Sequence, residues 1–164
     1  MIRLLFLSLT SFALSYLSLW GTDGAVSLLF SNYNPLLFVL GALFGALSLA
    51  FFNFVEGVMK DVPKALRVKN AEAYLGVIKT LTDLKREVIV NVMLVVVLLV
   101  VAYAAGAVYD LITLQEPNFE KRWIWSVLSI RGACALNVLV VIVLQAGGFV
   151  TANHLRAQIS MNGD

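Results

Sequence analysis

The sequence contains few of the residues from which metal and redox sites are built. Its 164 residues include one cysteine, Cys134, and one histidine, His154. A single cysteine excludes an intramolecular disulfide and a thiolate metal cluster, and a single histidine excludes a multi-histidine metal or haem site within one chain. The two residues also lie on one expected helix, about 30 Å apart at 1.5 Å per residue, which is too far for a nucleophile and its base.

The sequence also lacks the motifs that mark the common enzyme classes. It has no Walker A, GxGxxG or HExxH motif, no serine-centred nucleophile elbow, and no paired carboxylates inside an expected helix. We therefore expect neither an enzyme nor a bound cofactor or metal. Nucleic-acid binding is not expected either, because the basic residues are interleaved with acids and anionic lipid headgroups are the nearer target.

Charge is scarce as well. Charged residues make up 13% of the chain and hydrophobic residues 60%, with a mean hydropathy of +0.89. Soluble domains are about 45–50% apolar and about 25% charged. Since the apolar residues also gather in runs too long for a soluble core, the composition predicts an all-α integral membrane protein.

The longest uncharged run, residues 88–109, sets the expected organisation. As a helix it would be about 33 Å long, enough to cross a bilayer core of roughly 30 Å. Neither glycine nor proline lies between Val77 and Ala105, so one helix is expected over residues 70–110, with its charged first part in the cytosol. We expect four transmembrane helices in a single membrane domain (residues 1–164), with a cytosolic insertion at residues 56–87. The expected spans are about residues 4–21, 35–55, 88–109 and 127–151.

The first span follows Arg3 and is also compatible with a secretory signal peptide, although the run is long for one. With both termini inside, nine Lys and Arg residues lie on the inner side and only Lys121 and Arg122 on the outer side. The positive-inside rule therefore predicts cytoplasmic termini in a bacterial inner membrane. Aromatic residues at helix ends agree with one outer interface: Trp20, Tyr33, Tyr109, Trp123 and Trp125.

Small residues recur on the faces of the first three expected spans, where they permit close helix contact. Four serines of the first span are spaced three or four apart and share one face, which predicts a packing seam or, alternatively, the polar lining of a pore. A GxxxG pattern in the second span has a partner helix either in this chain or in another copy. The expected packing residues are Ser8, Ser11, Ser15, Ser18, Gly41, Gly45 and Gly106.

Four polar residues fall inside the third and fourth spans: Asn91, Arg131, Asn137 and Gln145. Arg131 has two interpretations. Either it is buried in the bilayer with Asp110 as its expected partner, which would indicate function, or the span begins after it and its side chain extends to the headgroups. Asn91 and Gln145 lie at similar depth and are expected to form a hydrogen-bonded clamp between helices.

Residues 56–87 have an apolar stripe at helical spacing, formed by Tyr74, Val77, Ile78, Leu81 and Leu84. A second copy of the chain is the favoured cover for this stripe; the alternatives are residues 57–69, the headgroup layer and a soluble partner. The basic residues of this region are expected to contact anionic lipids. They are Lys60, Lys64, Arg67, Lys69, Lys85 and Arg86.

These features predict an oligomeric anchor or sensor subunit that couples the membrane to a soluble cytosolic protein through residues 56–87. Its expected partners are the bilayer, further copies of itself (a tetramer is one candidate size) and that soluble protein. Phage defence and a stress response are the candidate settings, by analogy with small multi-span membrane subunits that have a cytosolic docking surface. The alternative function is an ion-conducting pore or a holin-like permeabilising protein.

Overall fold

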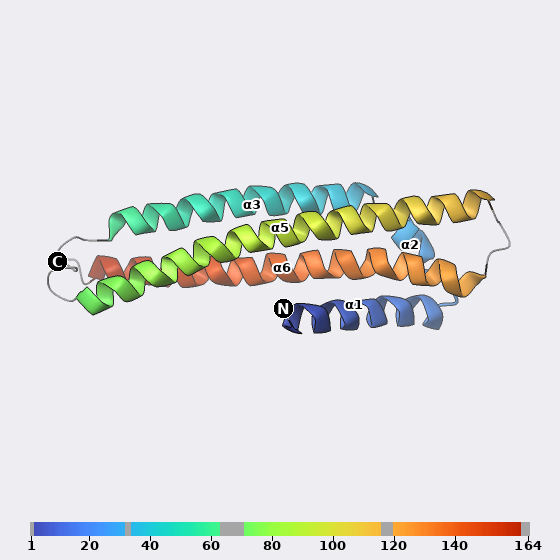
Figure 1. The fold of residues 1–164 in the computed structure, drawn as a ribbon, viewed down its shortest axis with the longest axis horizontal. Coiled ribbons are helices and arrows are strands. Elements are labelled where there is room, and N and C mark those ends of the chain that lie inside the picture. The colour runs from blue at the N-terminus through green and yellow to red at the C-terminus, as the bar shows by residue number, and fades with distance from the viewer. Residues whose placement is uncertain (1, 32–33, 63–70, 116–119, 162–164) are drawn as a thin grey trace. The chain divides into compact units, whose positions relative to one another are not determined.

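The computed structural model describes residues 2–31, 34–62, 71–115 and 120–161, and none of these residues is in a strand (Figure 1). The predicted all-α class is therefore confirmed. The helices are α1 (Ile2–Gly21), α2 (Ser27–Ser31), α3 (Asn34–Asp61), α5 (Ala71–Gln115) and α6 (Lys121–Met161). Among the described residues, α3, α5 and α6 are long and apolar enough to cross a membrane, whereas the apolar part of α1, Phe6–Gly21, is shorter.

The long helices extend beyond the predicted spans because their charged ends remain helical. In α3, Pro35 occupies the second position, where its missing N–H costs no helical hydrogen bond. The same helix continues through a Glu56–Lys60 ion pair one turn apart. The 45 residues of α5 form one helix, as the lack of proline predicts, and at 1.5 Å per residue it is about 67 Å long.

The contacts within the chain divide it into two compact units, which we describe separately. Unit 1 comprises Met1–Ala42 and Leu94–Val141, and unit 2 comprises Leu43–Met93 and Ile142–Asp164. Each division falls inside α3, α5 or α6 rather than in a loop. The expectation of a single membrane domain stays a prediction.

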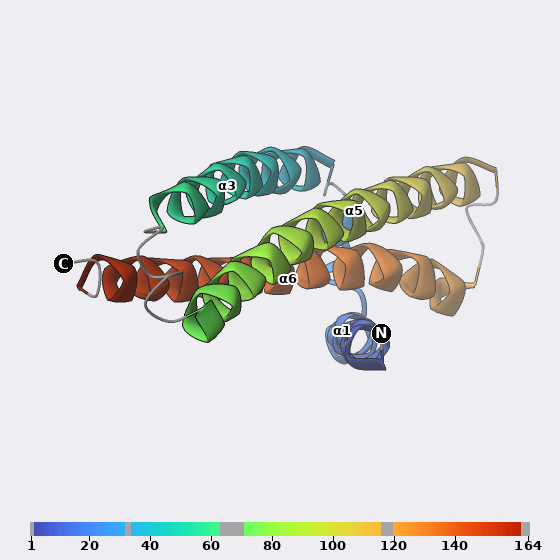
Figure 2. The same ribbon diagram turned by 60° about the vertical axis from the view of Figure 1, so that its left-hand side comes forward.

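In unit 1, α1 lies beside the 121–141 part of α6 (Figure 1, Figure 2). The small apolar core of this unit joins α3, α5 and α6 through Leu37, Ala102, Cys134 and Ala135. Gly41 allows α3 to approach α5 closely, since a Cβ atom built there would lie 2.9 Å from Leu99. The GxxxG glycine therefore has a partner in its own chain.

In unit 2, the larger apolar core is formed by the last part of α3, the first part of α5 and the last part of α6. Its buried residues are Phe51, Val55, Val58, Val62, Leu81, Val88 and Ala152. All five residues of the predicted apolar stripe are in or against this core. The stripe is thus covered by helices of the same chain. Val58 and Val62 belong to residues 57–69, one of the four expected covers, and the contribution of α6 through Ala152 was not expected.

A tight contact in unit 1 gives a first test of the fold. A Cβ atom at Gly132 would lie 2.5 Å from the Phe30 ring and 2.7 Å from Ser15 Oγ, whereas Gly147 on the same helix has nothing within 4 Å. Gly132→Ala should lower the free energy of unfolding by about 1–3 kcal/mol, the typical cost of overpacking. Gly147→Ala should be neutral or slightly stabilising. Thermal unfolding in detergent, followed by circular dichroism, measures both, and equal effects would contradict the packing.

Candidate functional site

The principal buried polar site surrounds Arg131, whose side chain is only 1% exposed. It projects from α6 toward the end of α2 and the start of α3. Its Nη1 donates a hydrogen bond of 2.8 Å to the carbonyl oxygen of Ser31, and its Nη2 donates to Asn34 Oδ1. The guanidinium therefore binds the segment between α1 and α3 to α6. Asn34 begins α3, and its side chain serves as an acceptor for Arg131.

The guanidinium fits because α5 has a glycine where it passes Arg131. A Cβ atom at Gly106 would lie 2.8 Å from Arg131 Cζ. The expected partner, Asp110, is exposed, and the ion pairs of the described residues do not include Arg131. Arg131 is thus buried inside the protein, and its hydrogen bonds are accepted by neutral oxygen atoms. The expected partner Asp110 interacts with it electrostatically without forming one of the ion pairs of the described residues. Among the described residues, Arg131 Nε has no hydrogen-bond partner.

Asn137 forms a second polar contact in unit 1, between α6 and the serine face of α1. Its Nδ2 donates to Ser8 Oγ at 3.2 Å, and its Oδ1 accepts from Ser11 Oγ at 3.3 Å. The buried hydroxyl of Ser15 has no hydrogen-bond partner among the described residues, and Ser18 donates back to the carbonyl oxygen of Ser15. Ser8 and Ser11, which contact α6, therefore form a packing seam, one of the two interpretations of the serine face.

Unit 2 contains a third polar contact. Gln145 Nε2 on α6 donates to Ser48 Oγ on α3 at 2.9 Å, and both side chains are buried. Asn91, the expected partner of Gln145, is half-buried on α5. Gln145 therefore joins two helices by a hydrogen bond, but its partner is Ser48 rather than Asn91. Gln145 Oε1 has no hydrogen-bond partner in the described part of the chain.

The charged end of unit 2 joins α3 to α5 and α6 through ion pairs. Glu56 pairs with Lys60 at 3.3 Å and with Lys85 at 3.6 Å, and Asp61 pairs with Arg156 at 3.5 Å. Lys85 and Lys60 were expected to contact lipid, and each also has this carboxylate partner. Arg86 is exposed, and Lys64, Arg67 and Lys69 lie outside the described residues.

The hydrogen bonds and ion pairs described above join neighbouring helices. The ion pairs also place the basic side chains of Lys60, Lys85 and Arg156 at the charged end of unit 2. Among the described residues, no group of three or more His, Cys, Asp or Glu side chains could hold a metal ion. A Cβ atom built at Gly45, the second glycine of the GxxxG pattern, would meet none of the described neighbouring atoms within 4 Å, so α3 is open at this position.

Sequence reasoning missed three residues that shape these sites. Ser48 is the single serine of the expected span at residues 35–55, but nothing in the sequence pairs it with Gln145. Gly132 is followed by Ala133, Cys134 and Ala135, and such a run of small residues is a signal for close packing. Glu56 has a lysine four residues later, which is a recognisable helix ion-pair pattern.

Removal of the acceptor at Asn34 tests the Arg131 site. Asn34→Ala leaves a buried guanidinium N–H without a partner, which should cost about 1–3 kcal/mol of unfolding free energy. Asn53→Ala is the matched control, because Asn53 is exposed on the same helix. Both variants are compared with the unsubstituted chain by thermal unfolding in detergent. A loss as large in Asn53→Ala would contradict the assigned role of Asn34.

No protein-family model, curated protein or solved structure matches this chain. The function is therefore inferred from the contacts of its own residues.

Proposed function

We propose that the chain is a membrane anchor or sensor subunit that transmits a change in the bilayer to a soluble partner. The observation that supports this most directly is the composition of the unit 2 core. Phe51 and Val88 of this core belong to the uncharged runs, whereas Val58 and Leu81 belong to the charged segment at residues 56–87. One packed core thus joins residues suited to lipid with residues suited to water.

Close packing makes this core a physical link between the two environments. A packed interior has few voids and transmits displacement, because side chains cannot move independently of their neighbours. A shift of α3 or α5 within the bilayer would therefore move the charged ends of the same helices. A soluble protein bound at those ends would sense the shift.

The partner is proposed to bind the polar faces of unit 2 rather than the apolar stripe, which is covered within the chain. These faces have mixed charge, which favours specificity and orientation of a protein partner over bulk hydrophobic association. The exposed charged residues available there are Lys60, Asp61, Glu72, Lys79, Asp83, Arg86, Glu87 and Arg156.

We further propose four spans, with α1 as the first, and both termini with the charged end of unit 2 in the cytoplasm of a bacterial inner membrane. The contacts of α1 support its membrane placement: Asn137, its partner, lies within the uncharged run after Arg131, and Leu9, Leu14 and Leu17 are exposed on α1. Exposed leucines beside an apolar helix are suited to lipid.

Cysteine labelling tests this topology. In intact cells, a membrane-impermeant maleimide should label Thr22→Cys and Lys121→Cys, and should label Asp83→Cys only after lysis. The native Cys134 is buried, so the unsubstituted chain provides the background. Labelling of Asp83→Cys in intact cells would contradict the orientation.

Photocrosslinking in intact cells tests the coupling function. A photoreactive residue at Asp83, which is exposed on the polar face of α5, should form a discrete crosslink to one soluble protein. The same residue at Leu49, exposed on α3 within the apolar run, is the control and should not. Charge reversal by Arg86→Glu should weaken the crosslink from position 83.

The possible outcomes separate the proposals. Crosslinks from position 83 only to further copies of the chain would replace the soluble partner with self-association. Crosslinks to no protein would refute both. The setting in phage defence or stress response, and the homo-oligomer, stay predictions.

The alternative of a pore has less support from the contacts described. Its expected lining was the serine face of α1, and Ser8 and Ser11 are bonded to Asn137 of the same chain. The pore and the holin-like activity stay alternatives that conductance across a planar bilayer would address.

A further inference from the structure

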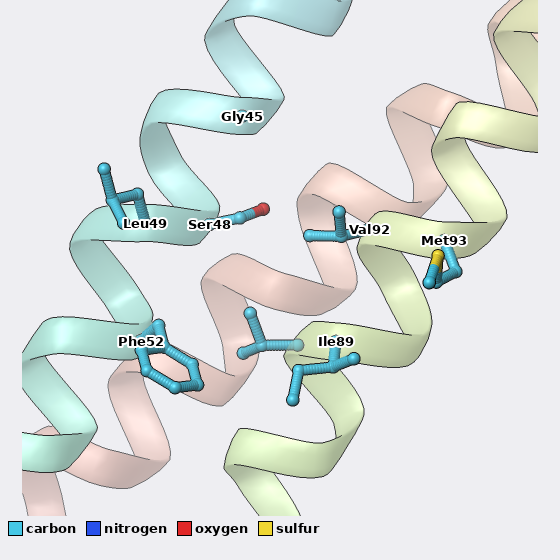
Figure 3. Close-up of a pocket in the computed structure, with 8 residues that line it drawn as sticks. Gly45, Ser48, Leu49, Phe52, Ile89, Val92 and Met93 are labelled. Carbon is cyan, nitrogen blue, oxygen red and sulfur yellow. The ribbon is translucent and has the colours of Figure 1, made fainter.

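A narrow groove runs between α3 and α5 on unit 2, with a volume of about 320 Å³ (Figure 3). Figure 3 shows Ser48 and Phe52 of α3 and Val92 of α5 pointing across it toward the opposite helix. Gly45 leaves room for the groove because it has no side chain, and a Cβ atom built there would meet none of the described neighbouring atoms within 4 Å. Its lining consists of Gly45, Ser48, Leu49, Phe52, Val88, Ile89, Val92 and Met93.

The walls of the groove suit a hydrocarbon chain. All lining residues belong to the uncharged runs 35–55 and 88–109, and only Ser48 has a polar side chain. Ser48 Oγ already accepts a hydrogen bond from Gln145. An apolar surface with its polar atom already bonded offers little to water and favours an apolar occupant.

The end of the groove nearest the charged segment is positive. Lys85 Nζ lies 4.4 Å from the centroid of the Phe52 ring, and Phe52 lines the groove. Glu56 pairs with both Lys85 and Lys60, so these three residues leave one net positive charge. The Lys85 side chain is only 26% exposed, so the residues packed around it and its ion pair with Glu56 restrict its motion.

We propose that this groove binds an acyl chain of an anionic phospholipid, with the phosphate group next to Lys85. The two parts of such a lipid match the two parts of the site, because the tail lies against the apolar walls and the phosphate compensates the unbalanced charge. The site requires unit 2 to lie in a bilayer and is independent of any soluble partner.

Unit 2 also contains a natural control. A second groove, of about 620 Å³, is formed between α3 and α6, and Ala46, Ala50 and Phe149 are among its lining residues. The ring of its lining residue Phe149 lies 4.7 Å from the ring of Phe54, over which Arg156 lies. Arg156 pairs with Asp61, so the pair has no net charge. Lipid tails at this second groove should therefore show no preference for an anionic headgroup.

Native mass spectrometry of the full chain in detergent tests the site, with phosphatidylglycerol and phosphatidylcholine of identical acyl chains as the probes. The unsubstituted protein should bind phosphatidylglycerol more tightly. Lys85→Gln should weaken this binding about fivefold, because one basic residue near an anionic headgroup contributes about 1 kcal/mol. Lys79→Gln removes the same charge from an exposed position of α5 and should change the affinity little.

Blocking the groove provides the second arm. Gly45→Phe should fill it and abolish the preference for phosphatidylglycerol, whereas Ala50→Phe, in the second groove, should retain the preference. Helical content and monodispersity verify folding, and Gly45→Leu serves as a smaller block. Equal affinity for the two lipids, an equal loss in Lys79→Gln, or an unchanged preference in Gly45→Phe and Gly45→Leu would each overturn the proposal.

Discussion

Burial of the Arg131 guanidinium is the constraint on which unit 1 depends. A charged group removed from water is costly unless its donors find acceptors, and the penalty is larger still in a region without water. Here the acceptors come from Ser31 and Asn34, at the end of α2 and the start of α3. The requirement of one side chain on α6 therefore fixes where the chain turns between α1 and α3. It also requires Gly106 on α5, because a larger residue would occupy the space of the guanidinium.

The sequence predicts the helices well and their side-chain partners poorly. The uncharged run at residues 88–109, with no proline, was sufficient to predict the single long α5, because helix formation follows from local composition and length. Partners depend on helix rotation and register, which a single sequence does not specify. Arg131 has Asn34 as an acceptor instead of Asp110, and Gln145 donates to Ser48 instead of pairing with Asn91.

The apolar stripe of residues 74–84 shows a related difficulty. Its spacing predicts a buried face correctly, and Leu81 is fully buried. The sequence does not reveal that α3 and α6 also extend far enough to cover it, since their uncharged runs end earlier than their helices. The charged end of unit 2 is consequently a three-helix core with charged residues on its surface, whereas residues exposed along the uncharged runs, such as Leu49 and Ile89, are apolar. The binding features of unit 2 are therefore charged faces and lipid-sized grooves.

The serine face of α1 has a consequence for how this helix finds its position. Because its serines recur nearly once per helical turn, a slide of α1 by one turn would place Asn137 between Ser11 and Ser15 instead of Ser8 and Ser11, with a similar set of hydrogen bonds. Ser15, buried without a partner in the observed position, would even gain one. The hydrogen bonds are thus periodic and do not select a register by themselves. The contact between the Phe30 ring of α2 and Gly132 of α6 is not periodic. Because only five residues join α1 to α2, this steric contact restricts how far α1 can slide along α6.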